Sequence, residues 1–388
     1  MTPSTLRRLR RLVALGLAPA LWLPALAGLV PDEPPTGLEA AELAAWTADA
    51  PPSPSTLNPE WDLMTRMFTV LGLSDRVVSA PGDMANQARI AAIDRILDLT
   101  RAELAQGGSH RFLLPYARSA PFRFAADRSL FVDGELALML AARHLASPEG
   151  SSAERLRAVL ARVTEQLEAG PIGSGESYPD ECWTFCNTTA LAALRLGDVA
   201  LGSDHGATIE RWLAEAKARL LDPQTGLLIS SYTLEGERLQ GPEGSTLWMS
   251  LHNLRLVDPD FAHAQYRLAR GELAIEVAGF GFAREWPRHG GGLGFADVDS
   301  GPVVPILDAS AGSSGLWFLG AASFGDQDGL ASLHRSLELF AFPDRDASGL
   351  RYRAAGAMGN AVLFAARSVG PLWRLASEQS SRRQGHGA

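Results

Sequence analysis

The stretch SAERLRAVLARVTEQLEAGPIGSGESYPDECWTFCNTTALAALRL, residues 152–196, contains a helical pattern, a long loop and a second helical pattern. The loop at 170–183 is rich in glycine and long for a compact domain, and it runs directly into the helical segment 184–197. In the first part of the stretch, apolar residues recur at the spacing of one face of an α-helix, at Leu156, Val159, Leu160, Val163 and Leu167.

The same alternation of helices and breaks continues along the chain. Short turns such as 222–226 alternate with long loops at 107–128, 170–183 and 280–306, and alternating strand patterns are nearly absent. Short and long connections in alternation predict an all-α (α/α)6 toroid, a barrel of six helix pairs, over residues 60–378. A stacked helical solenoid is the competing architecture. We count twelve helical segments, near 61–73, 86–106, 129–146, 152–169, 184–197, 207–221, 244–256, 261–279, 308–324, 327–341, 357–368 and 370–378.

The N-terminal residues have a different composition from the rest of the chain. The stretch MTPSTLRRLRR at 1–11 carries four arginines, and an apolar run that ends in Ala25-Leu26-Ala27 follows it. A basic segment, an apolar segment and a small-x-small site predict a secretory signal peptide over 1–27. We therefore expect a periplasmic or secreted protein.

An uncleaved membrane anchor is the alternative for this segment. Leu12 to Val30 is almost long enough to span a bilayer, although Pro19 and Pro24 argue against a regular spanning helix. Beyond it we expect a proline-rich linker at 28–59, extended around one short helical patch at 38–48, and a disordered tail at 379–388.

The composition indicates a globular protein that binds a small molecule. Of the 388 residues, 46% are hydrophobic and 20% charged, which suits a large buried core. The net charge is −9 and the basic residues do not form a stripe, so nucleic acid is excluded as a partner. A membrane is expected to be a partner only through the N-terminal segment.

The loop at 170–187 is the leading candidate site. Its last ten residues, YPDECWTFCN, place Asp180, Glu181 and Cys186 at the entrance of a helix, where the helix dipole favours carboxylates. A purely structural interpretation is that Asp180 or Thr184 caps the helix. Capping alone does not require two carboxylates, two cysteines and an asparagine together, so we predict a functional site.

The two cysteines, Cys182 and Cys186, lie four residues apart. An oxidising compartment allows them to pair, but a bridge over so short a loop is often strained and constrains little. Two unpaired thiols and a redox-labile local bridge both remain open.

Two further places carry carboxylates. In the glycine-rich loop at 289–302, Asp297 and Asp299 could supply an acid or base or hold a cation, or they could belong to an ordinary turn. Glu135 shares a helical stripe with Met139 and Ala142. We expect it to face the apolar barrel wall, where a raised pKa suits a general acid, although a lone glutamate near a helix start more often faces solvent. No GxSxG, HExxH or P-loop motif is present, and we predict no metal and no cofactor.

Several short motifs resemble the linalool dehydratase/isomerase family. They are YPDECWTFCN at 178–187, LLDPQTGL at 220–227 with Ser230-Ser-Tyr232, DPDF at 258–261, DGELALM at 133–139, and LRY at 350–352 with VLFAA at 362–366. Together they cover most of the body from about 129 to 372.

The resemblance implies an (α/α)6 barrel, export to the periplasm, a homo-oligomer and a cofactor-free reaction on a monoterpene alcohol. Cys186 and Asn187 fall on the family's Cys-Asn pair, and Asp180 falls on its Pro-Asp. Ser177 falls on the family's other active-site cysteine, Glu135 on its catalytic histidine, and Asp75 on an N-terminal aspartate.

These observations predict a lyase or isomerase of this family that acts by acid/base chemistry on a small apolar, terpenoid-like alcohol or alkene. Glu135 with Asp180 or Glu181 would exchange protons, and Cys186 and Asn187 would orient the substrate. Other side chains are candidates for lining its pocket: Tyr178, Trp183, Phe185, Tyr232 and Asp297.

Two other classes remain open. A carbohydrate-active toroid enzyme would use paired carboxylates, Glu135 or Asp180 with Asp299. A non-catalytic extracytoplasmic binding protein would have its carboxylates ion-paired, for example with Arg123 or Arg351.

Overall fold

The structure is a computed structural model. It describes residues 3–30, 36–50, 52, 58–123, 128–149, 152–289, 303–304 and 308–386. Asp297 and Asp299 lie outside the described residues.

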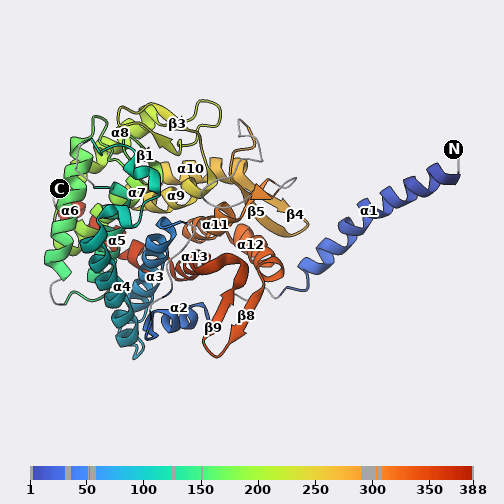
Figure 1. The fold of residues 1–388 in the computed structure, drawn as a ribbon, viewed down its shortest axis with the longest axis horizontal. Helices are drawn as coiled ribbons and strands as arrows, with labels where there is room; N and C mark the ends of the chain where they lie inside the picture. The colour runs from blue at the N-terminus through green and yellow to red at the C-terminus, as the bar shows by residue number, and fades with distance from the viewer. Residues whose placement is uncertain are drawn as a thin grey trace.

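Within the described residues, six helices form a closed inner ring; Figure 1 labels these helices. Each one contacts the next, and the last, α13, packs on the first, α3. This closure confirms the predicted all-α (α/α)6 toroid and excludes a linear solenoid. The ring runs in the order α3 (Glu60–Ser79), α5 (Leu130–Ala146), α7 (Thr184–Leu201), α9 (Gly244–Val257), α11 (Ala311–Phe324) and α13 (Gly356–Ser368).

An outer layer of helices covers the ring. Five of them each follow an inner helix and pack on it, namely α4 (Asn86–Gly107), α6 (Ser152–Ala169), α8 (Gly206–Arg219), α10 (Pro259–Leu273) and α12 (Gln327–Phe340). The helix α2 (Leu38–Thr47) forms where a short helical patch was expected within the linker, and it contacts α13 and α4 and buries Leu38 and Trp46. The place in the outer layer beside α13 is therefore occupied by α2, which precedes the first inner helix in the sequence.

The last helix, α14 (Pro371–His386), lies against α3, α7 and α9 at the end of the ring where the inner helices finish. The backbone N–H of Leu372 donates to the Asp75 carboxylate at 2.8 Å, and Trp373 Nε1 donates to the carbonyl of His252 at 3.0 Å. The helix continues through most of the segment in which a disordered tail was expected.

Because each outer helix returns the chain, all six inner helices run in the same direction. Their N-terminal ends therefore meet at the end of the ring opposite α14. Short 3-10 turns also lie in the loops, at η1 (Ser109–Arg111), η2 (Pro115–Arg118) and η3 (Arg353–Ala355).

A few short antiparallel sheets precede or link several of the described helices. The predicted helix 261–279 ends at Leu273, and a hairpin of β4 (Ala274–Val277) and β5 (Phe280–Arg284) follows. The other strands are β1 (Cys182–Trp183), β2 (Ser231–Tyr232), β3 (Arg238–Gln240), β6 (Val303–Val304), β7 (Ala309–Ser310), β8 (Pro343–Asp346) and β9 (Gly349–Tyr352). The sheet orders are β1-β2-β3, β4-β5-β7-β6 and β8-β9.

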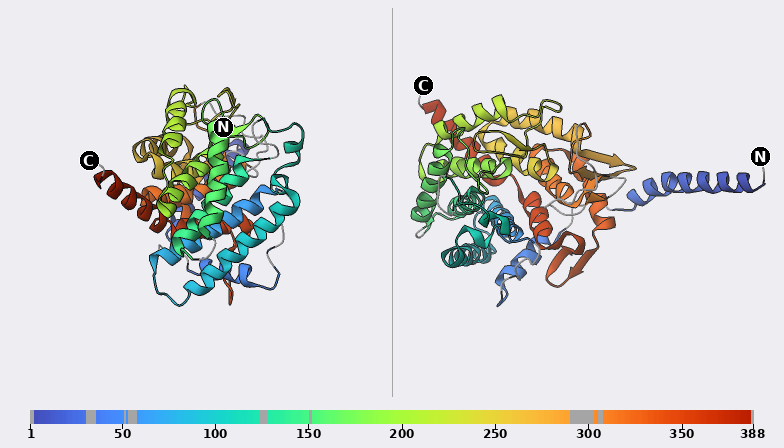
Figure 2. Two further views of the ribbon diagram at one scale, coloured as in Figure 1. Left: turned by 90° about the vertical axis from the view of Figure 1, so that its left-hand side faces the viewer. Right: turned by 45° about the horizontal axis from the view of Figure 1, so that its top comes forward.

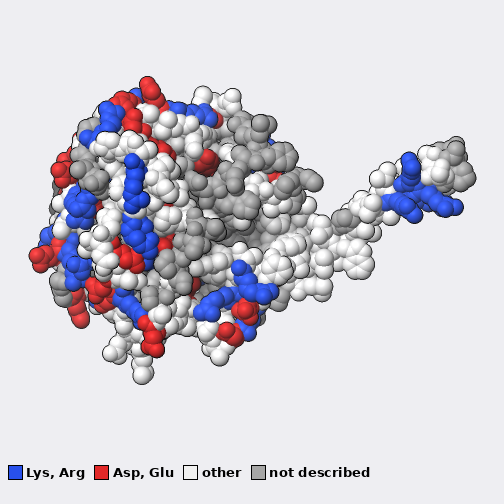
Figure 3. Space-filling model, in the orientation of Figure 1, with Lys and Arg blue, Asp and Glu red and all other residues white. Residues whose placement is uncertain are grey.

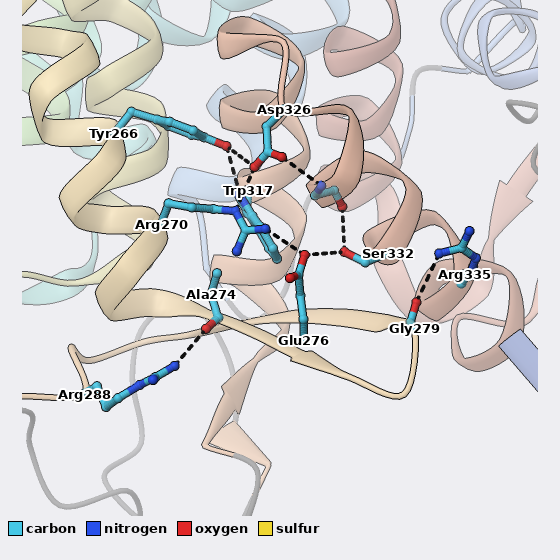
Figure 4. A network of polar contacts seen from close by, with 11 residues as sticks. Tyr266, Arg270, Ala274, Glu276, Gly279, Arg288, Trp317, Asp326, Ser332 and Arg335 are labelled. Atoms are coloured by element: carbon cyan, nitrogen blue, oxygen red, sulfur yellow. Dashed lines mark hydrogen bonds and ion pairs between the residues drawn. The ribbon is translucent and has the colours of Figure 1, made fainter. Parts of the chain in front are cut away.

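A polar network fixes this hairpin to the outer layer (Figure 4). Asp326 accepts hydrogen bonds from Tyr266 Oη and Arg270 Nε, both at 2.8 Å. Glu276 on β4 accepts from Arg270 Nη2 at 2.7 Å and from Ser332 Oγ at 3.2 Å. The two carboxylates thus join α10, β4 and α12 through one guanidinium.

The N-terminal segment forms a single helix, α1 (Pro3–Ala27), which extends away from the body (Figure 2). The two prolines at positions 19 and 24 were expected to disfavour a regular helix, but the helix continues through both positions. By length and composition this helix could cross a membrane, and it is not buried in the body. Its arginines gather near its free end (Figure 3).

Ring closure depends on a close approach of α3 and α13. A Cβ atom at Gly72 of α3 would stand 2.6 Å from the ring of Phe364, which is too close for any real contact. At Gly134 of α5, which faces Ala190 of α7, an added Cβ would stand at an ordinary 3.4 Å. An alanine at Gly72 would therefore force the Phe364 ring to shift, whereas an alanine at Gly134 would fit without a shift.

We predict that Gly72→Ala is less stable than Gly134→Ala by about 1–3 kcal/mol. Both replacements gain the same helix propensity, about 1 kcal/mol, so the difference between them isolates the steric clash. Urea unfolding of the two variants measures it. Equal stabilities would show that α13 can move away from α3 without cost.

Candidate active site

A cavity of about 270 Å³ lies where the N-terminal ends of the inner helices meet. All six inner helices contribute to its wall. The lining residues are Asn58, Glu60, Trp61, Met64, Tyr116, Phe131, Tyr178, Trp183, Phe185, Cys186, Gln240, Glu243, Ser245, Thr246, Glu285, Gly312, Leu316 and Met358.

Among the described residues, three glutamates line this cavity. Glu60 is the first residue of α3, Glu243 directly precedes α9, and Glu285 follows β5. Backbone N–H groups at helix N-termini carry partial positive charge, so a cavity built from six of them favours carboxylates. The position of the cavity in the ring therefore explains its acidic lining.

Glu60 is oriented by neighbours from two segments. The phenol of Tyr178 donates a hydrogen bond to its carboxylate, and Asn58 Nδ2 lies 3.5 Å from the same group. The Tyr178 oxygen also accepts the backbone N–H of Leu114 at 3.0 Å. Burial, and then the charge of Glu60, raises the pKa of Tyr178 above its usual value, so Tyr178 stays a hydrogen-bond donor.

Glu285 is held at the N-terminus of α9. Its carboxylate accepts a hydrogen bond from the Ser245 hydroxyl and another from the Ser245 backbone N–H at 3.2 Å. Its own carbonyl accepts the N–H of Gly244 at 2.7 Å. The strand end and the helix start are thus fixed together, with Glu243 beside them.

Aromatic side chains form much of the remaining wall. The rings of Tyr116 and Tyr178 stack with centroids 4.3 Å apart, and Tyr116 stays 42% exposed. Trp183 Nε1 donates to the Glu181 carboxylate, which fixes the indole. Apolar ring faces and polar tips are therefore both presented to the cavity.

The decapeptide 178–187 contributes four of its predicted residues to the lining: Tyr178, Trp183, Phe185 and Cys186. Asp180 does not join them, because its backbone adopts a φ of 54° in a tight turn and its carboxylate pairs with Arg123 at 3.1 Å near the surface. Glu181 lies outside the lining and acts on it through Trp183. Arg351, the other arginine considered, donates to Ser348 and to the carbonyl of Ala41 instead.

Three other predicted residues lie away from the cavity. Asn187 is buried and bonds through its amide to the backbone of Gly175 and Trp183, which pins the loop to α7. Tyr232 bonds with Ser174 and Trp212 inside the core. Asp75 is at the opposite end of the ring, where it accepts the N–H of Leu372.

The two cysteines are free and buried. Cys182 is on β1, opposite Tyr232, and Cys186 is on α7 at the cavity wall. Burial raises the pKa of both thiols well above the usual value, an effect that a hydrogen bond with Ser177 partly offsets at Cys186. Both side chains are therefore neutral thiols, which are poor nucleophiles.

Glu135 faces inward, as its helical stripe predicts. Its side chain is fully buried in the ring wall, one turn beyond Phe131, and it is not among the lining residues. Burial, and then the charge of Glu60, raises its pKa well above the usual value.

Glu60, Glu243 and Glu285 are not among the site residues predicted from the sequence. Each stands at or beside the start of an inner helix, or at a strand end that packs on one, and none belongs to a cluster of polar residues. A search for a carboxylate at the start of each inner helix of the predicted ring would have found the first two.

No protein family model matches the chain. Among solved structures, the chain is similar to the α-1,6-mannanase of Salegentibacter sp. HEL1_6, a family 76 glycoside hydrolase. That structure is an inactive variant in which two adjacent aspartates are replaced by alanine, in complex with α-1,6-mannotetrose. Identity is 12% and the TM-score is 0.50, over 89% of this chain and 99% of that one. The chain shares its fold.

Two further similar structures come from Bacteroides thetaiotaomicron. A family 76 mannosidase has 10% identity and a TM-score of 0.49, over 92% of this chain and 99% of that one. A family 76 α-mannanase has 11% identity and a TM-score of 0.47, over 79% and 85% of the two chains.

These comparisons overturn the resemblance to linalool dehydratase/isomerase. The similar structures are (α/α)6 toroids of a glycoside hydrolase family, so the predicted fold was right and the predicted chemistry was wrong. The expected lyase or isomerase reaction and the small apolar, terpenoid-like substrate are both withdrawn. Short shared motifs therefore do not establish a shared reaction.

We predict that neither cysteine reacts with iodoacetamide at pH 7 in the folded protein, because both thiols are buried and protonated. Both should react after unfolding in urea, without a reductant. Mass spectrometry counts the modified residues. A native protein that gains two labels, or an unfolded protein that gains none until it is reduced, would contradict the arrangement described above.

Proposed function

We propose that this protein is a glycoside hydrolase that binds a sugar in the cavity at the helix N-termini. One observation carries the proposal: Glu60 and Glu243 line the same cavity from opposite sides of the ring. They belong to α3 and to the start of α9, which are three places apart in a ring of six helices. Two carboxyl groups on either side of a glycosidic bond are what its hydrolysis requires.

In this proposal, one of the two glutamates protonates the leaving oxygen. The other acts on the sugar ring as a nucleophile or activates a water molecule. Tyr178 and Asn58 orient Glu60. Glu285, held by Ser245 at the N-terminus of α9, fixes the side of the cavity that carries Glu243.

The aromatic residues suit the same function. Sugar rings have apolar faces and polar edges, and the cavity presents aromatic rings beside carboxylates and hydroxyl groups. Tyr116 and Trp183 are the side chains that we propose to stack against the substrate, since both line the cavity and neither is buried.

Mannan oligosaccharides are the first substrates to test, because the similar solved structures are of mannanases and a mannosidase. The acidic residues of the site need not be those of the Salegentibacter enzyme, whose inactive variant replaces two adjacent aspartates. In this chain the adjacent pair in the site loop, Asp180 and Glu181, lies outside the cavity lining. Other glycans therefore belong in the same assay.

We also propose that the reaction takes place outside the cytoplasm. The apolar helix α1 supports this placement, either as a cleaved signal or as a retained anchor. The mass of the mature protein distinguishes the two.

We predict that Glu60→Gln and Glu243→Gln each lower kcat/KM by about 10²–10⁴-fold, the range for loss of an acid/base group. The substitution keeps the size of the side chain and removes its charge and its exchangeable proton. The assay is release of reducing sugar from a panel of α-mannan and other oligosaccharides.

Glu215→Gln is the matched control. Glu215 is on the outer helix α8 and outside the cavity lining, and it pairs with Arg219, so its replacement should leave the rate unchanged. If both cavity variants cleave sugar at the normal rate, the proposed pair is wrong. If the cavity variants lose activity, NMR of the anomer that the wild-type enzyme forms first shows whether hydrolysis retains or inverts the anomeric configuration.

A further inference from the structure

Glu135 is an unusual residue of the ring wall. It is a carboxyl group with no exposed surface, and neither of its oxygens has a hydrogen-bond partner among the described residues. A buried polar group without a partner is costly, and such groups are rare unless they serve a purpose. No packing argument requires a glutamate at this position.

The neighbours of Glu135 are acidic or neutral on the sides that face the ring. On α3 the Glu60 carboxylate acts electrostatically on Glu135, and on α7 both glutamates act on the neutral Cys186 thiol. Cys186 and Glu60 both line the cavity. Glu135 stands one turn beyond the lining residue Phe131 on α5, so it lies behind the cavity wall.

The cations near α5 are on its other face. Asp133, two residues before Glu135, points to α6, where Arg162 and Gln166 bond to it. Arg143 pairs with Asp94 on α4. Within the described residues, no guanidinium, ammonium or imidazole group acts on Glu135.

An ionised Glu135 would thus be a buried charge without a counter-ion, beside a second negative charge. Removing a charge from water without pairing it is strongly unfavourable, and the group avoids this by keeping its proton. Glu60 has polar neighbours and access to the cavity, so the negative charge of the two resides there.

We propose that Glu135 is a positioning residue for Glu60, a buried carboxylic acid whose proton keeps the negative charge of the pair on the cavity side. The inference rests on the proposed function, in which Glu60 is one of the two catalytic carboxyl groups. Two carboxyl groups that act on each other electrostatically lose their protons in two coupled steps. When Glu135 loses its proton at high pH, its charge opposes that of Glu60, and activity falls.

The activity test compares the pH dependence of kcat/KM in the full chain and in Glu135→Gln. Gln fills the same space but never ionises, so the alkaline limb of the profile should move up by about one pH unit or more, while the acid limb stays in place. A purely structural role would lower the rate at every pH without moving the limb. An unmoved alkaline limb overturns the inference.

Asp75→Asn is the matched control. Like Glu135, Asp75 is a buried carboxyl group, but it is on α3, at the end of the ring far from the cavity. Burial raises its pKa to about 8. Its replacement should leave the pH profile unchanged, although it alters stability. A shift of the same size in this variant would also overturn the inference.

A second measurement does not need activity. The infrared carbonyl band of a protonated carboxylic acid should be present in the wild type at neutral pH and weaker in Glu135→Gln, with Asp75→Asn and Glu42→Gln used to assign the bands of the other buried acids. In Glu60→Gln the Glu135 band should vanish at a lower pH, because the neighbouring charge is gone.

The outcomes separate the two proposals. If no glycan is cleaved but the band shifts in Glu60→Gln, the proposed function fails and the coupling of the two carboxyl groups stands. If glycans are cleaved but the band is absent, or does not respond to Glu60→Gln, the function stands and the role of Glu135 is overturned.

We also predict the effect of Glu135 on stability. Its pKa is raised in the folded protein, so the folded state binds more protons than the unfolded state between the ordinary glutamate pKa and the raised one. Stability due to this group is therefore full below the ordinary pKa and is lost as pH rises toward the raised one. Urea unfolding of Glu135→Gln should show a shallower loss of stability with pH than the wild type, and equal slopes would contradict the protonated state.

Discussion

The convergence of six helix N-termini on one cavity is the constraint on which the rest of the site depends. Each inner helix directs unpaired backbone N–H groups and the positive end of its dipole toward the same space. Glu60, Glu243 and Glu285 can therefore stand close together in a partly buried place. The field that stabilises them comes from the fold, and no lysine or arginine belongs to the described lining. Glu135 lies one turn beyond the lining residue Phe131, where no hydrogen-bond donor among the described residues reaches it.

The periodicity of apolar residues predicted the helices well, because burial of one helix face against a neighbour leaves a regular trace in the sequence. The same argument placed Glu135 on an inward stripe. Periodicity does not show which partner fills each place in the ring. The position of α2 beside α13 depends on contacts between residues far apart in sequence, and Leu38 and Trp46 give no local sign of them. The hairpin β4-β5 was missed because its first strand continues the apolar pattern of α10.

The loop before α7 was predicted as the candidate site, but only some of the residues predicted in it line the cavity. Tyr178, Trp183, Phe185 and Cys186 reach the cavity because the loop before α7 ends at its wall. Asp180 attracted attention as a carboxylate at a helix start, yet its turn sends it to Arg123. The local sequence shows which residues carry reactive groups, but it does not show the direction in which a turn points their side chains. The residues that form the opposite wall come from α3, α9 and β5, and only the closed ring brings them to the loop.

Closure of the ring also governs how the chain can fold. The bond between Asp75 and Leu372 joins residues 297 positions apart, and that between Ala41 and Arg351 joins residues 310 positions apart. Contacts of such long range form late and slowly, because closing the long loop between them costs conformational entropy before the contacts contribute any stabilising free energy. The cavity wall shares this delay, since α3 and α13 both contribute to it. Until the C-terminal third has been synthesised, the N-terminal helices have an exposed apolar edge, and the nascent protein is at its most vulnerable to aggregation.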